Sequence, residues 1–115
     1  MVNLKAQYYS SKDEINRAIG DVLESGWFVL GKELEAFEVE FAAYCQSHFG
    51  VGVGSGTEAL HLALLACGIK PGDEVITTPN TAVAVACAIS FANANPVFVD
   101  IDEDTYTIDA SRIEK

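Results

Sequence analysis

The sequence predicts an α/β fold in which a mostly parallel sheet has flanking helices and is preceded by two N-terminal helices. Several segments repeat apolar residues at helical spacing, and short runs rich in Val, Ile and Phe stand between the later ones. Because helical segments of about ten residues separate these runs, the pattern favours parallel βαβ units with right-handed crossovers.

Two amphipathic helices are expected first. Ser11 and Glu14 form a capping-box pattern, and apolar residues follow at helical spacing, so the first helix is predicted over Ser11–Glu24. The second is predicted over 32–45, with one apolar stripe and a glutamate-rich face that we expect to be solvated. The stripe holds Leu34, Phe37, Phe41 and Tyr44, and the glutamates are Glu33, Glu35, Glu38 and Glu40.

Strands and helices are then expected to alternate. The predicted elements are a short strand near 49–53, a helix over Thr57–Ala66 stopped by Gly68, a strand over 74–78, a helix over Ala82–Ala92 and a strand over 96–101. Either Asp109 or Ser111 is suited to cap one more helix.

Composition limits the class of protein. At 115 residues and 50% apolar, the chain can form at most one globular domain. With 7 Lys and Arg against 17 Asp and Glu, the net charge is -10, which disfavours nucleic acid and anionic membranes as partners. No stretch reaches the ~18 apolar residues of a membrane span, so a soluble cytoplasmic protein is expected.

The three cysteines are odd in number and widely spaced. We expect Cys45, Cys67 and Cys87 to be small buried apolar residues in a reducing compartment, because their spacing fits neither a disulfide framework nor a zinc site.

The helix over Ala82–Ala92 carries no charge on any face, and such a helix must be covered all round. A chain this short can hardly cover it, so more protein is expected to pack there, from a longer chain or a second subunit. Together with the capping signal near Asp109, this suggests that the sequence is a fragment.

The turn Gly54–Ser55–Gly56–Thr57 lies between a predicted strand and a predicted helix. Free backbone N–H groups and the helix dipole favour an anion at such a place, and the hydroxyls of Ser55 and Thr57 can donate as well. The alternative is that the glycines only make a tight turn and that Ser55 or Thr57 only caps the helix.

Two common phosphate loops do not fit this turn. A dinucleotide fingerprint needs a third glycine where Thr57 stands and an acid at the end of the second strand, which instead ends in Thr77–Thr78. A Walker loop needs Gly-Lys-Ser/Thr, whereas this helix opens with Gly56–Thr57–Glu58. A single phosphate held mainly by backbone fits better.

Three stretches, "GWFVLGKELEAFEVEFAAYCQSHFGVGVGSGTEALHLAL", "KPGDEVITTPNTAVA" and "NPVFVDIDEDTYTID", resemble the DegT/StrS-type sugar aminotransferases, which are fold type I pyridoxal-phosphate enzymes. The resemblance implies that residues 1–115 are the N-terminal portion of the large aminotransferase domain. It implies that Gly56, Thr57 and the backbone of Glu58 bind the phosphate of pyridoxal 5'-phosphate. The family usually has an aromatic residue that stacks on the cofactor ring where this chain has Ala82, so either stacking is weaker or another group covers that face.

The resemblance also implies a reaction, the transfer of an amino group from an amino acid, expected to be glutamate, to a nucleotide-linked keto-sugar by a homodimer. The family's imine-forming lysine and the acid that pairs with the ring nitrogen belong to a later part of the family's sequence. No catalytic residue is therefore expected in this chain, whose lysines are Lys5, Lys12, Lys32, Lys70 and Lys115. Two alternatives are a sugar dehydratase of the same fold and a non-catalytic module for phosphate binding or dimerisation.

By the same resemblance, Tyr8 and the loop Gly26–Trp27–Phe28 border the sugar-nucleotide pocket, although the two aromatic residues of the loop can equally plug a core. His48 and His61 are expected to be structural, because no triad pattern surrounds them. The acids at 100 and 102–104 are expected to form a solvated turn and not a metal site.

Overall fold

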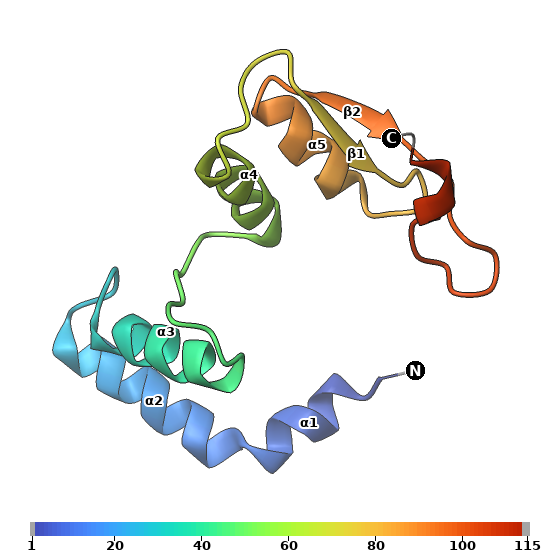
Figure 1. Cartoon of the computed structure of the whole chain (residues 1–115). Coiled ribbons are helices and arrows are strands. Elements are labelled where there is room, and N and C mark those ends of the chain that lie inside the picture. Colours follow the sequence, from blue (N-terminus) through green and yellow to red (C-terminus); the bar gives the residue numbers. More distant parts are fainter. Residues whose placement is uncertain (1, 114–115) are drawn as a thin grey trace. The chain divides into compact units, whose positions relative to one another are not determined.

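The computed structural model describes residues 2–113, and the chain divides into two compact units at the bond between Gly52 and Val53 (Figure 1). The first unit is helical, and the second combines helices with a small sheet. Each unit is described by itself below.

Within the described part of the first unit, the elements are α1 (Leu4–Ser10), α2 (Lys12–Ser25) and α3 (Lys32–Tyr44). The sequence did not predict α1, which begins where the Asn3 side chain accepts a hydrogen bond from the Ala6 N–H at 3.0 Å. The capping box predicted at Ser11 is wrong, because the Ser11 side chain makes no capping hydrogen bond, although the residue does precede α2. Gly26 ends α2 in the left-handed conformation at φ +64°.

The aromatic stripe predicted on α3 forms a ladder. The rings of Phe37 and Phe41 lie 5.5 Å apart between centroids, and those of Phe41 and Tyr44 lie 6.4 Å apart. All three side chains are at least half exposed, so the stripe is not covered within its own unit. The glutamates of α3 are exposed, as predicted, with the exception of Glu38. This side chain is half-buried, and its Oε1 accepts the Gly52 N–H at 2.6 Å.

The strand predicted near 49–53 is absent from the described structure, where two of its glycines instead lie close to α3. A Cβ at Gly50 would stand 2.6 Å from the Glu38 carbonyl oxygen, and a Cβ at Gly52 would stand 2.6 Å from Leu34 Cδ1. The backbone at Gly50 and Gly52 therefore lies directly on α3, where the Glu38 side chain accepts the Gly52 N–H.

The second unit contains α4 (Gly56–Ala66), β1 (Glu74–Thr77), α5 (Val83–Phe91), β2 (Asn95–Phe98) and the 3-10 turn η1 (Ala110–Arg112). β1 and β2 pair in parallel, from Glu74 opposite Asn95 to Thr77 opposite Phe98, with α5 as the crossover between them (Figure 1). The predicted parallel βαβ unit is thus confirmed.

The core of this unit lies along α5 and its exit, and α4 packs on α5. Its buried apolar residues are Ala88, Ile89, Ala92 and Ala94. At the ends of α5, Val83 and Phe91 are 77% and 59% exposed, so the uncharged helix is only partly covered by the described residues.

An antiparallel bridge between Ile101 and Ile108 closes the loop after β2. The acids of this loop lie in a turn, as expected, and Asp102 accepts hydrogen bonds from the Thr105 N–H at 2.8 Å and its hydroxyl at 2.9 Å. Asp109 caps η1 by accepting the Ser111 N–H at 3.0 Å, which confirms the capping signal but places only a 3-10 turn within the described residues.

The expected burial of the cysteines is wrong for two of them. Cys45 and Cys67 are exposed and each stands at the C-cap of its helix, whereas Cys87 inside α5 is partly buried. In the part of the chain that the structure describes, none of the helices is long and apolar enough to cross a membrane.

Candidate phosphate-binding site at the start of α4

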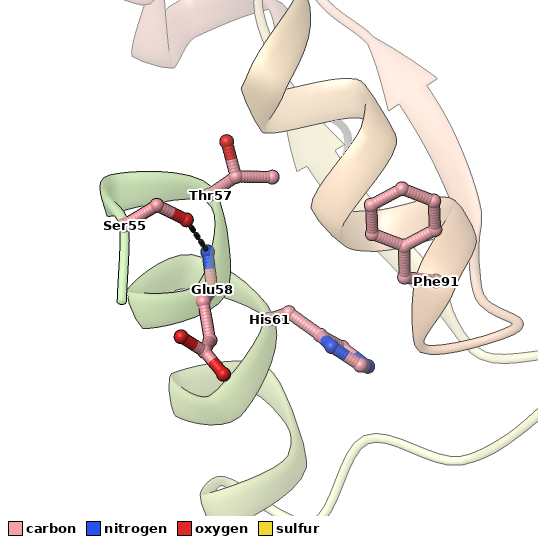
Figure 2. A pocket seen from close by; sticks show the side chains of 5 residues that line it. All are labelled: Ser55, Thr57, Glu58, His61 and Phe91. Atoms are coloured by element: carbon pink, nitrogen blue, oxygen red, sulfur yellow. Dashed lines mark hydrogen bonds between the residues drawn. The ribbon is translucent and has the colours of Figure 1, made fainter. Parts of the chain in front are cut away.

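The glycine turn is held by two hydrogen bonds that run in opposite directions. Ser55 is the N-cap of α4, and its Oγ accepts the Glu58 N–H at 3.2 Å (Figure 2). The Glu58 carboxylate folds back, so that its Oε2 accepts the Gly54 N–H at 2.7 Å. This is a capping box in which the glutamate binds the amide one residue before the N-cap.

Two backbone donors at this helix start remain free. Within residues 2–113, the amides of Gly56 and Thr57 have no protein acceptor, as expected for the first turn of a helix. Over the same range the Thr57 hydroxyl makes no hydrogen bond, and a Cβ at Gly56 would meet open space. Ser55 is thus the capping residue, which leaves the Thr57 hydroxyl available to a ligand.

A depression of about 260 Å³ lies beside these donors. Its walls come from two helices: Thr57, Glu58 and His61 lie on α4, Ser55 is the N-cap of α4, and Phe91 lies on α5 (Figure 2). The His61 ring meets the Phe91 ring edge-on, with 6.0 Å between centroids. The depression thus combines the Thr57 hydroxyl, a hydrogen-bond donor, with the aromatic surface of Phe91 and His61.

Three of the four predicted cofactor-binding residues, Gly56, Thr57 and Glu58, lie together at the start of α4, and the last two line the depression. Ala82 is the exposed N-cap of α5 and is not among the lining residues. The sequence analysis did not predict Phe91 at this depression, because the sequence of a wholly apolar helix does not show which way each side chain points. The Ser55-x-x-Glu58 spacing could have revealed the capping box.

The predicted substrate-binding residues all belong to the first unit. The Tyr8 hydroxyl donates to Asn16 Oδ1 at 3.4 Å near the start of α2, whereas Gly26 ends that helix, roughly 15 Å further along at 1.5 Å per residue. Trp27 and Phe28 are 54% and 65% exposed, so they do not plug a core in their own unit. The Trp27 indole N–H donates to the Val29 carbonyl at 2.7 Å, which fixes the ring within the loop.

Comparison with known proteins shows the family to which a chain with this site belongs. The model of the DegT/DnrJ/EryC1/StrS aminotransferase family matches residues 9–115. The chain therefore belongs to this family, as the resemblance implied.

Individual relatives are similar to this chain over nearly its whole length. Over 114 residues, the chain is 49% identical to the dTDP-3-amino-3,4,6-trideoxy-alpha-D-glucose transaminase of Streptomyces venezuelae and 46% identical to a pleiotropic regulatory protein of Geobacillus stearothermophilus. Each match covers 99% of this chain and 30% or 31% of the relative. The chain thus spans about 30% of the length of these curated relatives.

The fold also matches solved structures. The crystal structure of S. venezuelae DesV superposes with a TM-score of 0.93 at 49% identity, over 96% of this chain and 30% of that one. NtdA from Bacillus subtilis, solved with bound cofactor PMP, gives 0.87 at 35% identity, over 90% and 24%. These similarities confirm the predicted α/β class as part of the fold type I aminotransferase architecture.

Proposed function

We propose that residues 1–115 form the N-terminal portion of a pyridoxal-phosphate-dependent sugar aminotransferase. The enzyme moves an amino group from an amino acid, glutamate in our proposal, to a nucleotide-linked keto-sugar. The observation that carries the proposal is the pair of free amides at Gly56 and Thr57, beside the free Thr57 hydroxyl, in a chain of this family. The names of several relatives support a sugar substrate.

In this proposal the start of α4 binds the cofactor phosphate. The amides of Gly56 and Thr57 and the Thr57 hydroxyl donate to its oxygens, and the helix dipole adds to the attraction. The Glu58 N–H already donates to Ser55 Oγ, so it can bind the phosphate only as a shared donor. When bound, the cofactor supplies an electron sink for amino-group chemistry, and this turn holds it in place.

The imine-forming lysine is proposed to lie elsewhere in the complete protein. Lys5, Lys12, Lys32 and Lys70 are exposed and do not line the depression, and Lys115 lies outside the described residues. Reading the coding sequence on both sides of this chain tests the point directly. A reading frame that carries no lysine in the family's context would contradict the aminotransferase.

Further roles are proposed for the remaining residues. Exposed Trp27 and Phe28, with Gly26 and Tyr8, are proposed to border the sugar-nucleotide pocket, because exposed rings can stack on a base or sugar. Ala82 is proposed to face the cofactor ring, with the stacking surface supplied by another group. A homodimer is proposed, since partly uncovered α5 leaves apolar surface for a second subunit.

The test uses the complete protein that carries this chain. Pyridoxal 5'-phosphate is titrated by absorbance, with pyridoxal lacking the phosphate as the control, and the loaded protein is then given glutamate and a keto-sugar nucleotide. We expect selective binding of the phosphorylated form and an aminated sugar product. Equal binding of both forms would refute the phosphate site, and a deoxygenated product without amination would identify a dehydratase.

A further inference from the structure

The Glu58 side chain has no role in the proposed function, yet it makes the shortest hydrogen bond at the site. Its Oε2 lies 2.7 Å from the Gly54 amide, whereas Ser55 Oγ lies 3.2 Å from the Glu58 amide. This bond ties a side chain of the first turn of α4 to Gly54, so Glu58 helps to fix the residue at which the turn begins.

The charge of Glu58 has two opposite effects at this helix start. A carboxylate is favourable at a helix N-terminus, because it meets the positive end of the dipole. A phosphate bound by Gly56 and Thr57 would use the same favourable field and would repel the carboxylate beside it. The charge of Glu58 therefore opposes the ligand, whereas its hydrogen bond orders the amides that bind the ligand.

We propose that Glu58 is a positioning residue for the phosphate: it holds the turn through the Gly54 N–H, and this role needs the hydrogen bond and not the charge. The inference rests on the proposed function, because it concerns the same phosphate. It assigns to the side chain a task separate from that of the backbone amide.

Two replacements separate the bond from the charge in the complete protein. Glu58→Gln keeps an acceptor oxygen at the same reach and removes the charge, whereas Glu58→Ala removes both. We expect Glu58→Gln to bind pyridoxal 5'-phosphate at least as tightly as the parent. We expect Glu58→Ala to bind roughly fivefold more weakly than Glu58→Gln, the factor for one net hydrogen bond.

Gly54→Ala breaks the same bond from the other side. A Cβ at Gly54 would stand 2.8 Å from Glu58 Oε2, so the flexible carboxylate must move away from the amide. If the two residues act through one bond, Gly54→Ala weakens binding at least as much as Glu58→Ala does, because it loses the bond and keeps the repelling charge, and the double variant is no worse than Gly54→Ala. Glu103→Ala, at an exposed carboxylate in the loop after β2, is the control for losing a distant charge.

Hydrogen exchange at the Gly54 amide in the cofactor-free protein gives a second readout. Exchange should be faster in Glu58→Ala than in Glu58→Gln. Equal affinities and equal exchange in these two variants would overturn the inference, as would additive losses in the double variant. If the parent itself fails to prefer the phosphorylated cofactor, the proposed function fails instead, and the exchange result still reports on the bond.

Discussion

At the scale of single residues, the structure shows which side chain caps α4, whereas the sequence allowed either Ser55 or Thr57. Ser55 caps α4, the Glu58 carboxylate binds the Gly54 amide, and Thr57 keeps its hydroxyl free. Because the cap does not depend on Thr57, a substitution there tests the proposed ligand binding without removing the cap.

Thr57→Ala should weaken the binding of pyridoxal 5'-phosphate about tenfold or more in the complete protein. A charge-assisted hydrogen bond contributes roughly 1.5 to 3 kcal/mol, and ~1.4 kcal/mol corresponds to one decade of affinity. Absorbance titration measures the affinity. The thermal midpoint of the cofactor-free protein should change little, since Thr57 is not the cap.

Gly56→Val is the companion variant. The backbone at Gly56 does not need positive φ, so the expected effect is steric: in our proposal the new side chain fills open space beside the amides that bind the phosphate. If both variants bind the phosphorylated cofactor as tightly as the parent does, the turn is structural and the phosphate site is wrong.

At the scale of elements, the glycines at 50, 52 and 54 serve different contacts. Gly50 and Gly52 allow the chain to lie against α3, whereas Gly54 belongs to the start of α4. The glycine-rich stretch thus provides close packing in the first unit and, in the second, the start of α4 that we propose to bind phosphate.

Gly50→Ala should lower the free energy of unfolding of the complete protein by about 1 to 3 kcal/mol, because the new Cβ meets the rigid Glu38 carbonyl at 2.6 Å. Gly20→Ala is the matched control. Gly20 lies inside α2 with nothing within 4 Å of its Cβ position, so alanine should stabilise by roughly 0.5 to 1 kcal/mol. Urea unfolding of both variants checks the pair, and equal effects would contradict the close contact.

The loop after β2 should loosen in acid. Hydrogen bonds from the Thr105 backbone and side chain lower the pKa of Asp102 below 3.8, and those from the Ser111 side chain and backbone lower the pKa of Asp109 below the same value. Since the folded pKa is depressed, the stabilising effect is present above pH ~4 and is lost as the pH falls through the folded pKa.

Carboxyl and amide chemical shifts of this loop, followed by NMR from pH 6 to about 2, measure the loosening. Asp102→Asn keeps an acceptor oxygen without the titration. The chemical shift of the Thr105 amide should therefore change less with pH in this variant. An unchanged pH dependence would exclude Asp102 as the cause of the loosening.

At the scale of the whole molecule, each unit leaves large apolar side chains exposed. Examples are Tyr44 at 83% and Phe49 at 86% in the first unit and Val83 at 77% in the second. Surfaces of this kind mark interaction sites, which agrees with a chain that spans about 30% of its relatives.

The 115-residue chain by itself should therefore associate as its concentration rises. Sedimentation velocity at several concentrations measures this, and Val83→Lys, at the exposed start of α5, should reduce it. A compact monomer with cooperative unfolding at all concentrations would contradict the expectation.

The sequence by itself determined the helices after residue 11, the parallel βαβ unit and the place of the glycine turn. These depend on periodicity, crossover length and glycine spacing, which are local properties. Only the tertiary structure decided that the backbone at Gly50 and Gly52 packs on α3, and that Cys45 and Cys67 are exposed. It also decided that Glu38 binds the Gly52 amide, fourteen residues away, since the partner of such a side chain depends on what the fold brings beside it.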